Sequence, residues 1–141
     1  MRKQKLSVTV KSGRGFYIGD ICYVLSTRDY HRIWGDQKHF SDGKVDIPGG
    51  LSFAVAGTNF GDGLYEDEDG NLYPVDAAVI GIVPLELVAK DDGLRFGRVE
   101  RVSGEAGFTA EDGVFDVSLP DGERIHIDTR YMSDSEYTVT D

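Results

Sequence analysis

The sequence contains six Asp-Gly pairs, and they constrain its fold more than any other feature. They lie at 42–43, 62–63, 69–70, 92–93, 112–113 and 121–122. Asp-Gly is favoured where a tight turn between strands needs a residue at positive φ. Most intervals between the pairs hold β-branched and aromatic residues in period-two alternation, the pattern of half-buried strands. The pairs are irregularly spaced, which argues against a fixed repeat. The sequence therefore predicts a mainly β protein, an antiparallel barrel or sandwich.

The clearest strands form a hairpin in which residues 114–119 and 124–128 flank the turn Pro120-Asp121-Gly122. Two nearly continuous apolar runs, Leu51 to Ala56 and Ala78 to Val83, predict strands at 51–56 and 78–82 that are buried on both faces. The remaining predicted strands are 6–11, 15–18, 20–25, 63–66, 71–75, 95–102 and 136–140.

One segment resists the strand pattern and predicts a short helix near residues 27–34. Ser26 with Asp29 three residues later resembles a capping box, and Gly35 would end the helix. A second helical turn is expected at 84–88. No linker divides the chain, so residues 1–141 are expected to form a single β-rich domain.

The chain is acidic, with a net charge of −10 over 141 residues. Residues 1–44 hold nine Lys/Arg against four Asp/Glu, whereas residues 45–89 hold eight acids and no Lys or Arg. This balance argues against general nucleic-acid binding, because phosphates would be repelled over most of the surface. No apolar run approaches the roughly 20 residues that span a bilayer. With one Cys, no intrachain disulfide can form, and the cytoplasm is the expected location.

The stretch 61–76 places six acids in sixteen positions and has two readings. As a calcium loop with Gly70 at the sixth position, it would put Tyr65 at the first and Asp76 at the last, with no flanking helices. The other reading is a hairpin with a turn at 67–70, Gly70 left-handed and the acids at a solvated tip. The hairpin accounts better for the residues. His31, His39 and His126 have no metal-ligand spacing, so neither a metal site nor a cofactor is expected.

The basic, aromatic segment 28–40 is the best candidate for a ligand site, because guanidinium groups bind phosphate and aromatic faces stack on bases. Its alternative role is structural, with the rings in the core and the cations in solvent. The candidate ligand-binding residues are Arg28, His31, Arg32, Trp34 and Lys38.

Cys22 lies in an apolar stretch, where a cysteine is usually a small core residue. A Cys nucleophile would need a neighbouring His or helix N-terminus, and the three His are distant in sequence. Asp20 is expected to be a turn residue that binds backbone groups. The chain has neither a Gly-x-Ser-x-Gly elbow nor a Walker loop, so no catalytic residue is assigned.

Three short motifs between about residues 15 and 88 resemble a known set of signatures. They are Gly19-Asp20-Ile21-Cys22-Tyr23-Val24, Gly61-Asp62-Gly63-Leu64-Tyr65 and Val75-Asp76-Ala77-Ala78. The chain resembles a group of small uncharacterised bacterial and phage proteins with G-D-P-C-Y-V, G-D-G-x-Y and V-D-x-G signatures. It departs from them at Ile21, where Pro is usual, and at Ala78, where Gly is usual. The resemblance implies a β-rich domain, a bacterial or phage origin, and one spatial cluster of Asp20, Cys22, Asp62 and Asp76.

Three functions are compatible with these features. The first is a non-enzymatic protein, monomeric or homo-oligomeric, that binds a small anionic, nucleotide-like ligand. If it comes from a phage, it would sequester a signalling nucleotide in the host cytoplasm. The second is an acidic inhibitor of a basic protein partner. The third is a small hydrolase built on the Asp/Cys cluster. A binding protein is expected rather than an enzyme.

Overall fold

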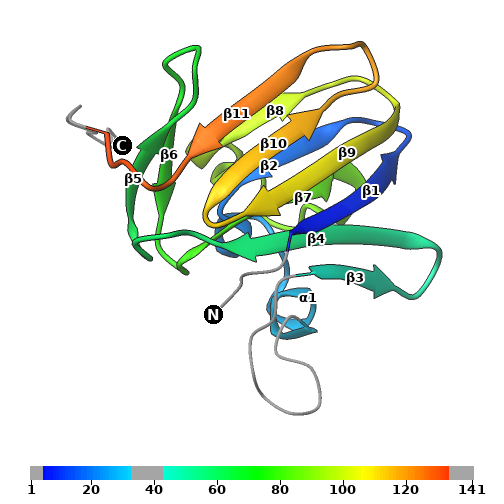
Figure 1. The fold of residues 1–141 in the computed structure, drawn as a ribbon. Coiled ribbons are helices and arrows are strands. Elements are labelled where there is room, and N and C mark those ends of the chain that lie inside the picture. The colour runs from blue at the N-terminus through cyan, green and yellow to red at the C-terminus, as the bar shows by residue number, and fades with distance from the viewer. Residues whose placement is uncertain (1–4, 33–42, 134–141) are drawn as a thin grey trace.

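Two antiparallel sheets face each other in the computed structural model, which describes residues 5–32 and 43–133 (Figure 1). The four-stranded sheet has the order β1 (Leu6–Ser12), β9 (Gly104–Glu111), β10 (Val114–Ser118), β11 (Arg124–Asp128). The five-stranded sheet has the order β3 (Gly43–Ile47), β4 (Leu51–Gly57), β7 (Val79–Pro84), β2 (Phe16–Gly19), β8 (Arg98–Glu100). Strands β5 (Gly63–Glu66) and β6 (Leu72–Val75) form a separate hairpin. Within the described residues no strand pairing closes the sheets into a barrel, so the fold is a sandwich.

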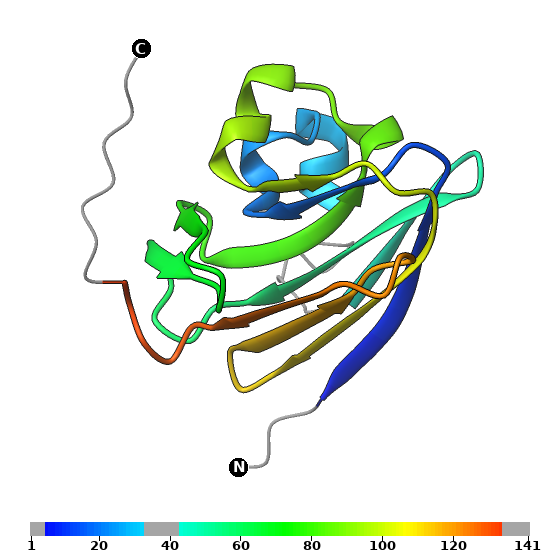
Figure 2. The ribbon, with the colours of Figure 1, turned by 90° about the horizontal axis from the view of Figure 1, so that it is seen from above.

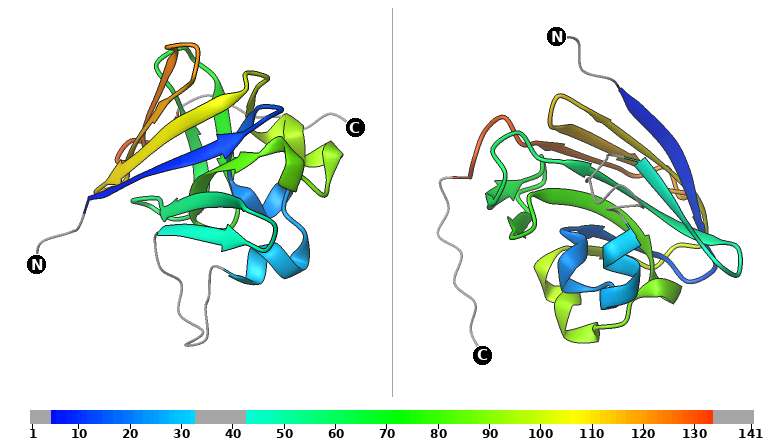
Figure 3. Two further views of the ribbon diagram at one scale, coloured as in Figure 1. Left: turned by 90° about the vertical axis from the view of Figure 1, so that its right-hand side faces the viewer. Right: turned by 90° about the horizontal axis from the view of Figure 1, so that it is seen from below.

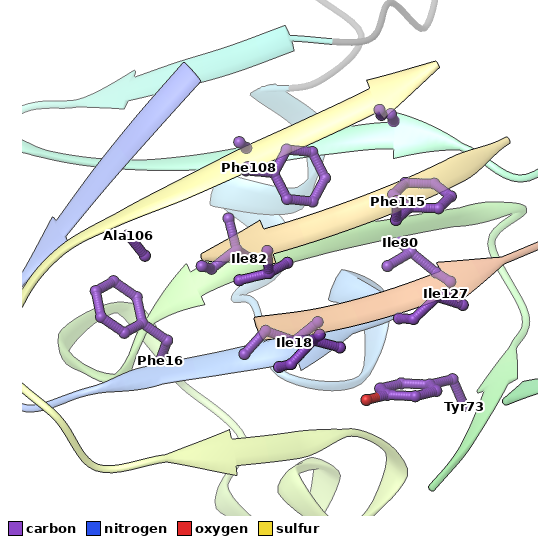
Figure 4. Close-up of a cluster of buried hydrophobic side chains, with 14 of the residues drawn as sticks. Phe16, Ile18, Tyr73, Ile80, Ile82, Ala106, Phe108, Phe115 and Ile127 are labelled. Carbon is purple, nitrogen blue, oxygen red and sulfur yellow. The ribbon is translucent and has the colours of Figure 1, made fainter. Parts of the chain in front are cut away.

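The main core lies between the two sheets (Figure 4). Strands β9 and β10 alternate buried and more exposed residues, as expected of a sheet with one face on the core. Phe108 and Phe115 point inward from this sheet and meet Ile18, Ile80 and Ile82 of the other. All five side chains are fully buried, so the hydrophobic effect holds the two layers together.

The five-stranded sheet is buried on its outer face as well. In the described part of the chain, short helices cover that face: η1 (Ile21–Tyr23), α1 (Thr27–His31), η3 (Leu85–Leu87) and η4 (Asp91–Phe96). Together they form a third layer, called here the helical layer (Figure 2). Figure 3 shows the same layer from two further sides. This layer explains why β4 and β7 are almost entirely apolar, as the sequence indicated.

Most predicted strands and the short helix are confirmed, but residues 20–25 are not a strand. Apolar residues at 21, 23, 24 and 25 fit a strand, yet this segment forms η1 and the turn that follows it. The reason is local, because the Asp20 side chain accepts a hydrogen bond from the Cys22 backbone N–H at 2.9 Å. A side-chain cap of this kind competes with strand pairing.

The prediction of a strand at 95–102 is only partly correct, since η4 continues to Phe96 and β8 spans Arg98–Glu100. Strands β3 and β9 were not predicted. The predicted strand 136–140 and the helix end at Gly35 lie outside the described residues. None of the helices in the described ranges is long and apolar enough to cross a membrane.

Candidate functional site

Asp20 anchors the region that carries the sequence motifs. Its side chain is fully buried at the start of η1. One carboxylate oxygen accepts the Cys22 N–H, and the other accepts the N–H groups of Asp76 and Ala77, both at 2.7 Å. Burial raises the pKa of Asp20, and these hydrogen bonds offset only part of that increase. Asp20 is therefore a backbone-binding residue that fastens η1 to the loop between β6 and β7.

Cys22 is half-buried beside this carboxylate. Burial raises the pKa of the Cys22 thiol well above its usual range, and the negative charge of Asp20 raises it further. Lys90 acts in the opposite direction but does not compensate. Because the thiolate and not the thiol is the nucleophile, this environment does not activate Cys22.

The four residues of the motif-derived cluster lie near Tyr30 of α1. Burial raises the pKa of the Tyr30 phenol, and the neighbouring Cys22, Asp20, Asp76 and Asp62 raise it further, so all four are within electrostatic range of this one side chain. The cluster does not provide a metal site, since no group of three or more His, Cys, Asp or Glu side chains in the described part of the chain could hold a metal ion.

The loops that carry Asp62 and Asp76 are tied together through Thr58. Its backbone N–H donates to the Ala78 carbonyl at 3.0 Å, and its hydroxyl donates to the Gly61 carbonyl at 2.6 Å. These contacts join residues far apart in sequence, so the motifs meet because the fold brings their loops together.

Helix α1 carries the described part of the predicted ligand segment. The Ser26 hydroxyl accepts from the Asp29 N–H at 3.1 Å, which caps the helix as the sequence indicated. Arg28 and His31 are exposed, and the Arg32 Nε lies 3.1 Å from an Asp29 carboxylate oxygen. Trp34 and Lys38 lie outside the described residues.

A cavity of about 210 Å³ opens between η1 and η4, beside Cys22; its lining residues are Cys22, Tyr23, Lys90, Asp92, Gly93 and Phe96. We call it the η1–η4 cavity. The rings of Tyr23 and Phe96 stack with their centroids 4.4 Å apart, and the Arg95 guanidinium lies 4.9 Å from the Phe96 centroid. The Lys90 ammonium donates to the Cys22 carbonyl at 3.4 Å.

Glycine at 93 lets η4 approach η1, because a Cβ there would overlap the Tyr23 carbonyl. The sequence alone does not indicate this cavity. Asp92-Gly93 predicts a turn, and the local sign of a binding site is the pair of cations, Lys90 and Arg95, that flank it.

The acidic stretch is a hairpin, as predicted. Glu66 pairs with Leu72 across it, and Gly70 is left-handed with φ 86°. The prediction that its acids lie at a solvated tip is wrong for Asp67, which is only 6% exposed. The Asp67 carboxylate accepts hydrogen bonds from the Tyr73 hydroxyl at 2.6 Å and from the Asn71 N–H at 2.9 Å.

Arg98 on β8 connects this tip to the rest of the sandwich. Its guanidinium lies within 2.7–3.5 Å of four carboxylates, those of Asp67, Asp69, Glu100 and Glu123. Asp67 and Asp69 of the tip therefore stabilise the fold by pairing with Arg98, and only the exposed acids of the tip face solvent.

No protein-family model matches the sequence, and neither a curated protein nor a solved structure matches it. The resemblance in the three short motifs is accordingly neither supported nor contradicted. The function has to be inferred from the geometry of the site itself.

Proposed function

We propose that the protein is a non-enzymatic binding protein that holds a small anionic, nucleotide-like ligand on its helical layer. The η1–η4 cavity carries this proposal, because it combines the Lys90 ammonium with the stacked rings of Tyr23 and Phe96. The exposed Arg28 guanidinium and the exposed His31 imidazole lie on α1 in the same layer.

The chemistry of the lining suits one phosphate and one ring. An ammonium pairs with phosphate as a point charge, and aromatic side chains offer apolar contact to a base. The volume of about 210 Å³ is below the roughly 300 Å³ at which drug-sized ligand sites begin. A mononucleotide would thus place part of itself in the cavity and the rest on the surface. Asp92 on the same wall disfavours a polyphosphate.

The neighbouring titratable groups support binding over catalysis. The Asp20 carboxylate is held by hydrogen bonds from the backbone N–H groups of Cys22, Asp76 and Ala77, and its side chain is fully buried. The Cys22 thiol is neutral because burial and Asp20 raise its pKa. Neither group offers an accessible base or nucleophile, which disfavours a hydrolase built on the Asp/Cys cluster. If the chain is phage-encoded, as its motifs suggest, the ligand would be a host signalling nucleotide sequestered in the host cytoplasm.

Thermal denaturation in the presence of a nucleotide panel tests this function. Mononucleotides, cyclic nucleotides and nucleoside diphosphates are each added far above a micromolar Kd. A ligand present at a hundred times its Kd stabilises the folded state by about 2.7 kcal/mol, which corresponds to several degrees in Tm. If no nucleotide raises the Tm, the proposed function is wrong.

Matched variants then locate the ligand. Lys90→Ala should reduce the ligand-induced rise in Tm strongly, and Arg28→Ala with His31→Ala should reduce it in part. Arg124→Ala is the control, since this exposed arginine lies on β11 in the other sheet and should leave the rise unchanged. An equal effect of Arg124→Ala would place the ligand elsewhere.

A further inference from the structure

Three large hydrophobic side chains are exposed in the described residues: Phe60 at 55%, Tyr131 at 71% and Met132 at 48%. We call them the apolar end patch. Single exposed apolar residues are ordinary, whereas a group on one surface marks an interaction site.

The patch lies on two neighbouring segments, the loop between β4 and β5 and the chain that follows β11 (Figure 1). The Asn59 N–H donates to the Thr129 hydroxyl at 2.9 Å, and the Ser133 N–H donates to the Leu64 carbonyl at 2.8 Å. Between these contacts, the Met132 methyl packs on Gly63. The hydrogen bonds at both ends hold the two segments side by side, so the three side chains belong to one surface.

Acids border this surface. Asp62 on the β4–β5 loop, Glu66 at the end of β5 and Asp112 in the β9–β10 turn are exposed, and none of them takes part in an ion pair between described residues. The β9–β10 turn adjoins the patch because the Thr129 N–H donates to the Gly113 carbonyl at 2.9 Å. One cation also borders the patch: the Arg130 guanidinium lies 5.9 Å from the centroid of the Tyr131 ring, and it is bound to Asp128 at 2.8 Å, which offsets its charge. The patch therefore has an apolar centre and a negative rim.

We propose that the apolar end patch is a docking surface for a basic protein segment that carries apolar anchor residues. Buried aromatic anchors supply most of the affinity at such interfaces, and complementary charge at the rim supplies rate and specificity. A second copy of this chain fits poorly, because a two-fold contact would bring one acidic rim against the other. An anionic lipid surface is disfavoured for the same reason. This docking surface is independent of the ligand site on the helical layer.

A labelled synthetic peptide of Lys, Arg, Leu and Phe is the probe, and fluorescence anisotropy gives its Kd. Two matched peptides replace the basic residues by Glu or the apolar residues by Ser. We expect only the basic, apolar peptide to bind. Phe60→Ser with Tyr131→Ser should raise its Kd at least roughly tenfold, which corresponds to about 1.4 kcal/mol. Both side chains are exposed, so this variant should keep the fold, as its circular dichroism and Tm would show.

The rim is tested by Asp62→Asn with Glu66→Gln and Asp112→Asn, which should raise the Kd and flatten its dependence on salt. The charge-matched control is Asp46→Asn with Asp91→Asn and Glu105→Gln, three exposed acids elsewhere on the molecule. It should leave the Kd within about twofold, because these acids lie on β3, η4 and β9, outside the rim, and salt screens exposed charges.

Four outcomes would overturn the proposal. The first is that no peptide binds at millimolar concentration, and the second is that the Phe60 and Tyr131 variant binds as tightly as the wild type. The third is a dimer in sedimentation velocity that the same variant converts to a monomer, which would make the occupant a second copy. The fourth is peptide binding only to a chain that ends at Ser133, which would make the occupant the chain's own C-terminal residues.

Discussion

At the scale of single residues, Ala78 in the loop between β6 and β7 has a strained backbone conformation. Its φ is 62°, a left-handed conformation that costs a residue with a Cβ about 1 kcal/mol. The turn is held on both sides, since the Ala77 N–H donates to the Asp20 carboxylate and the Ala78 carbonyl accepts from Thr58. The surrounding contacts therefore impose the conformation on an alanine.

Replacing Ala78 by Gly should therefore stabilise the protein, by about 0.5–1 kcal/mol in the free energy of unfolding. The control is Ala77→Gly at the neighbouring position, whose φ is not positive. There the added freedom of the unfolded chain should destabilise by a similar amount. Urea unfolding of both variants measures the difference. A loss of stability in Ala78→Gly equal to that in Ala77→Gly would show that the turn is not strained.

Some single-residue roles were predictable because they depend on near neighbours. Asp20 as a backbone-binding residue and Gly70 as the left-handed residue of a hairpin turn both follow from local turn chemistry. The environment of Cys22 was not predictable, because it depends on Asp76 and Lys90, which are more than fifty residues away. Only the motif resemblance suggested that Asp20, Cys22, Asp62 and Asp76 belong together.

At the scale of elements, the hairpin of β5 and β6 shows where a sequence pattern misleads. A run of acids in a turn indicates a solvated tip, yet Asp67 points inward to Tyr73 and Arg98. Burial raises the pKa of Asp67, but the hydrogen bonds from Tyr73 and Asn71 together outweigh it, so the pKa lies below its ordinary value. Stability from this group is present above the unfolded pKa of about 3.9 and is lost as the pH falls through the folded pKa.

Asp67→Ala should consequently destabilise the protein by about 2–4 kcal/mol, because it leaves the buried Tyr73 hydroxyl and the Arg98 guanidinium without their shared acceptor. Asp69→Ala, two residues away, is the matched control. Its side chain is 67% exposed, so its loss should cost less than about 1 kcal/mol. Chemical denaturation at neutral pH compares the two. Equal effects would mean that both acids only face solvent.

The two strands that were not predicted share a composition that weakens the sequence signal. Strand β9 buries Ala106 and Ala110 as well as Phe108, and alanine carries little strand preference. Strand β3 is an edge strand with only Val45 and Ile47 as apolar residues. In both cases the pairing with a neighbouring strand, which is a tertiary contact, decides the structure.

At the scale of the whole molecule, alternation and turn chemistry predicted a mainly β, antiparallel fold but could not choose between a barrel and a sandwich. That choice depends on which strands lie at the sheet edges, and the order β3-β4-β7-β2-β8 joins strands far apart in sequence. The helical layer could not be predicted from the sequence either, because 3-10 helices of three to six residues are too short to show a helical period of apolar residues. The candidate cavity lies in that layer, so its position could not be predicted either.

On the outer face of the four-stranded sheet, acidic residues of this protein, whose net charge is −10, surround one histidine, His126. His126 on β11 lies opposite Asp116 on β10, with its Nδ1 2.7 Å from a carboxylate oxygen. The hydrogen bond to Asp116 raises the pKa of His126, and the charges of Asp116, Glu68 and Asp128 raise it further. These acids come from β10, from β11 itself and from the turn of the β5–β6 hairpin, so three elements act on one imidazole.

Because the folded state binds this proton more tightly, its contribution to stability is fully present below the unfolded pKa of about 6.5 and is lost as the pH rises through the folded pKa. The side chain is 36% exposed, so the change should stay below about 1 kcal/mol. His126→Gln should remove this part of the pH dependence, which urea unfolding between mildly acidic and mildly alkaline pH would measure. NMR titration of the imidazole provides the direct check, and a folded pKa below the unfolded value would reverse the sign of the effect.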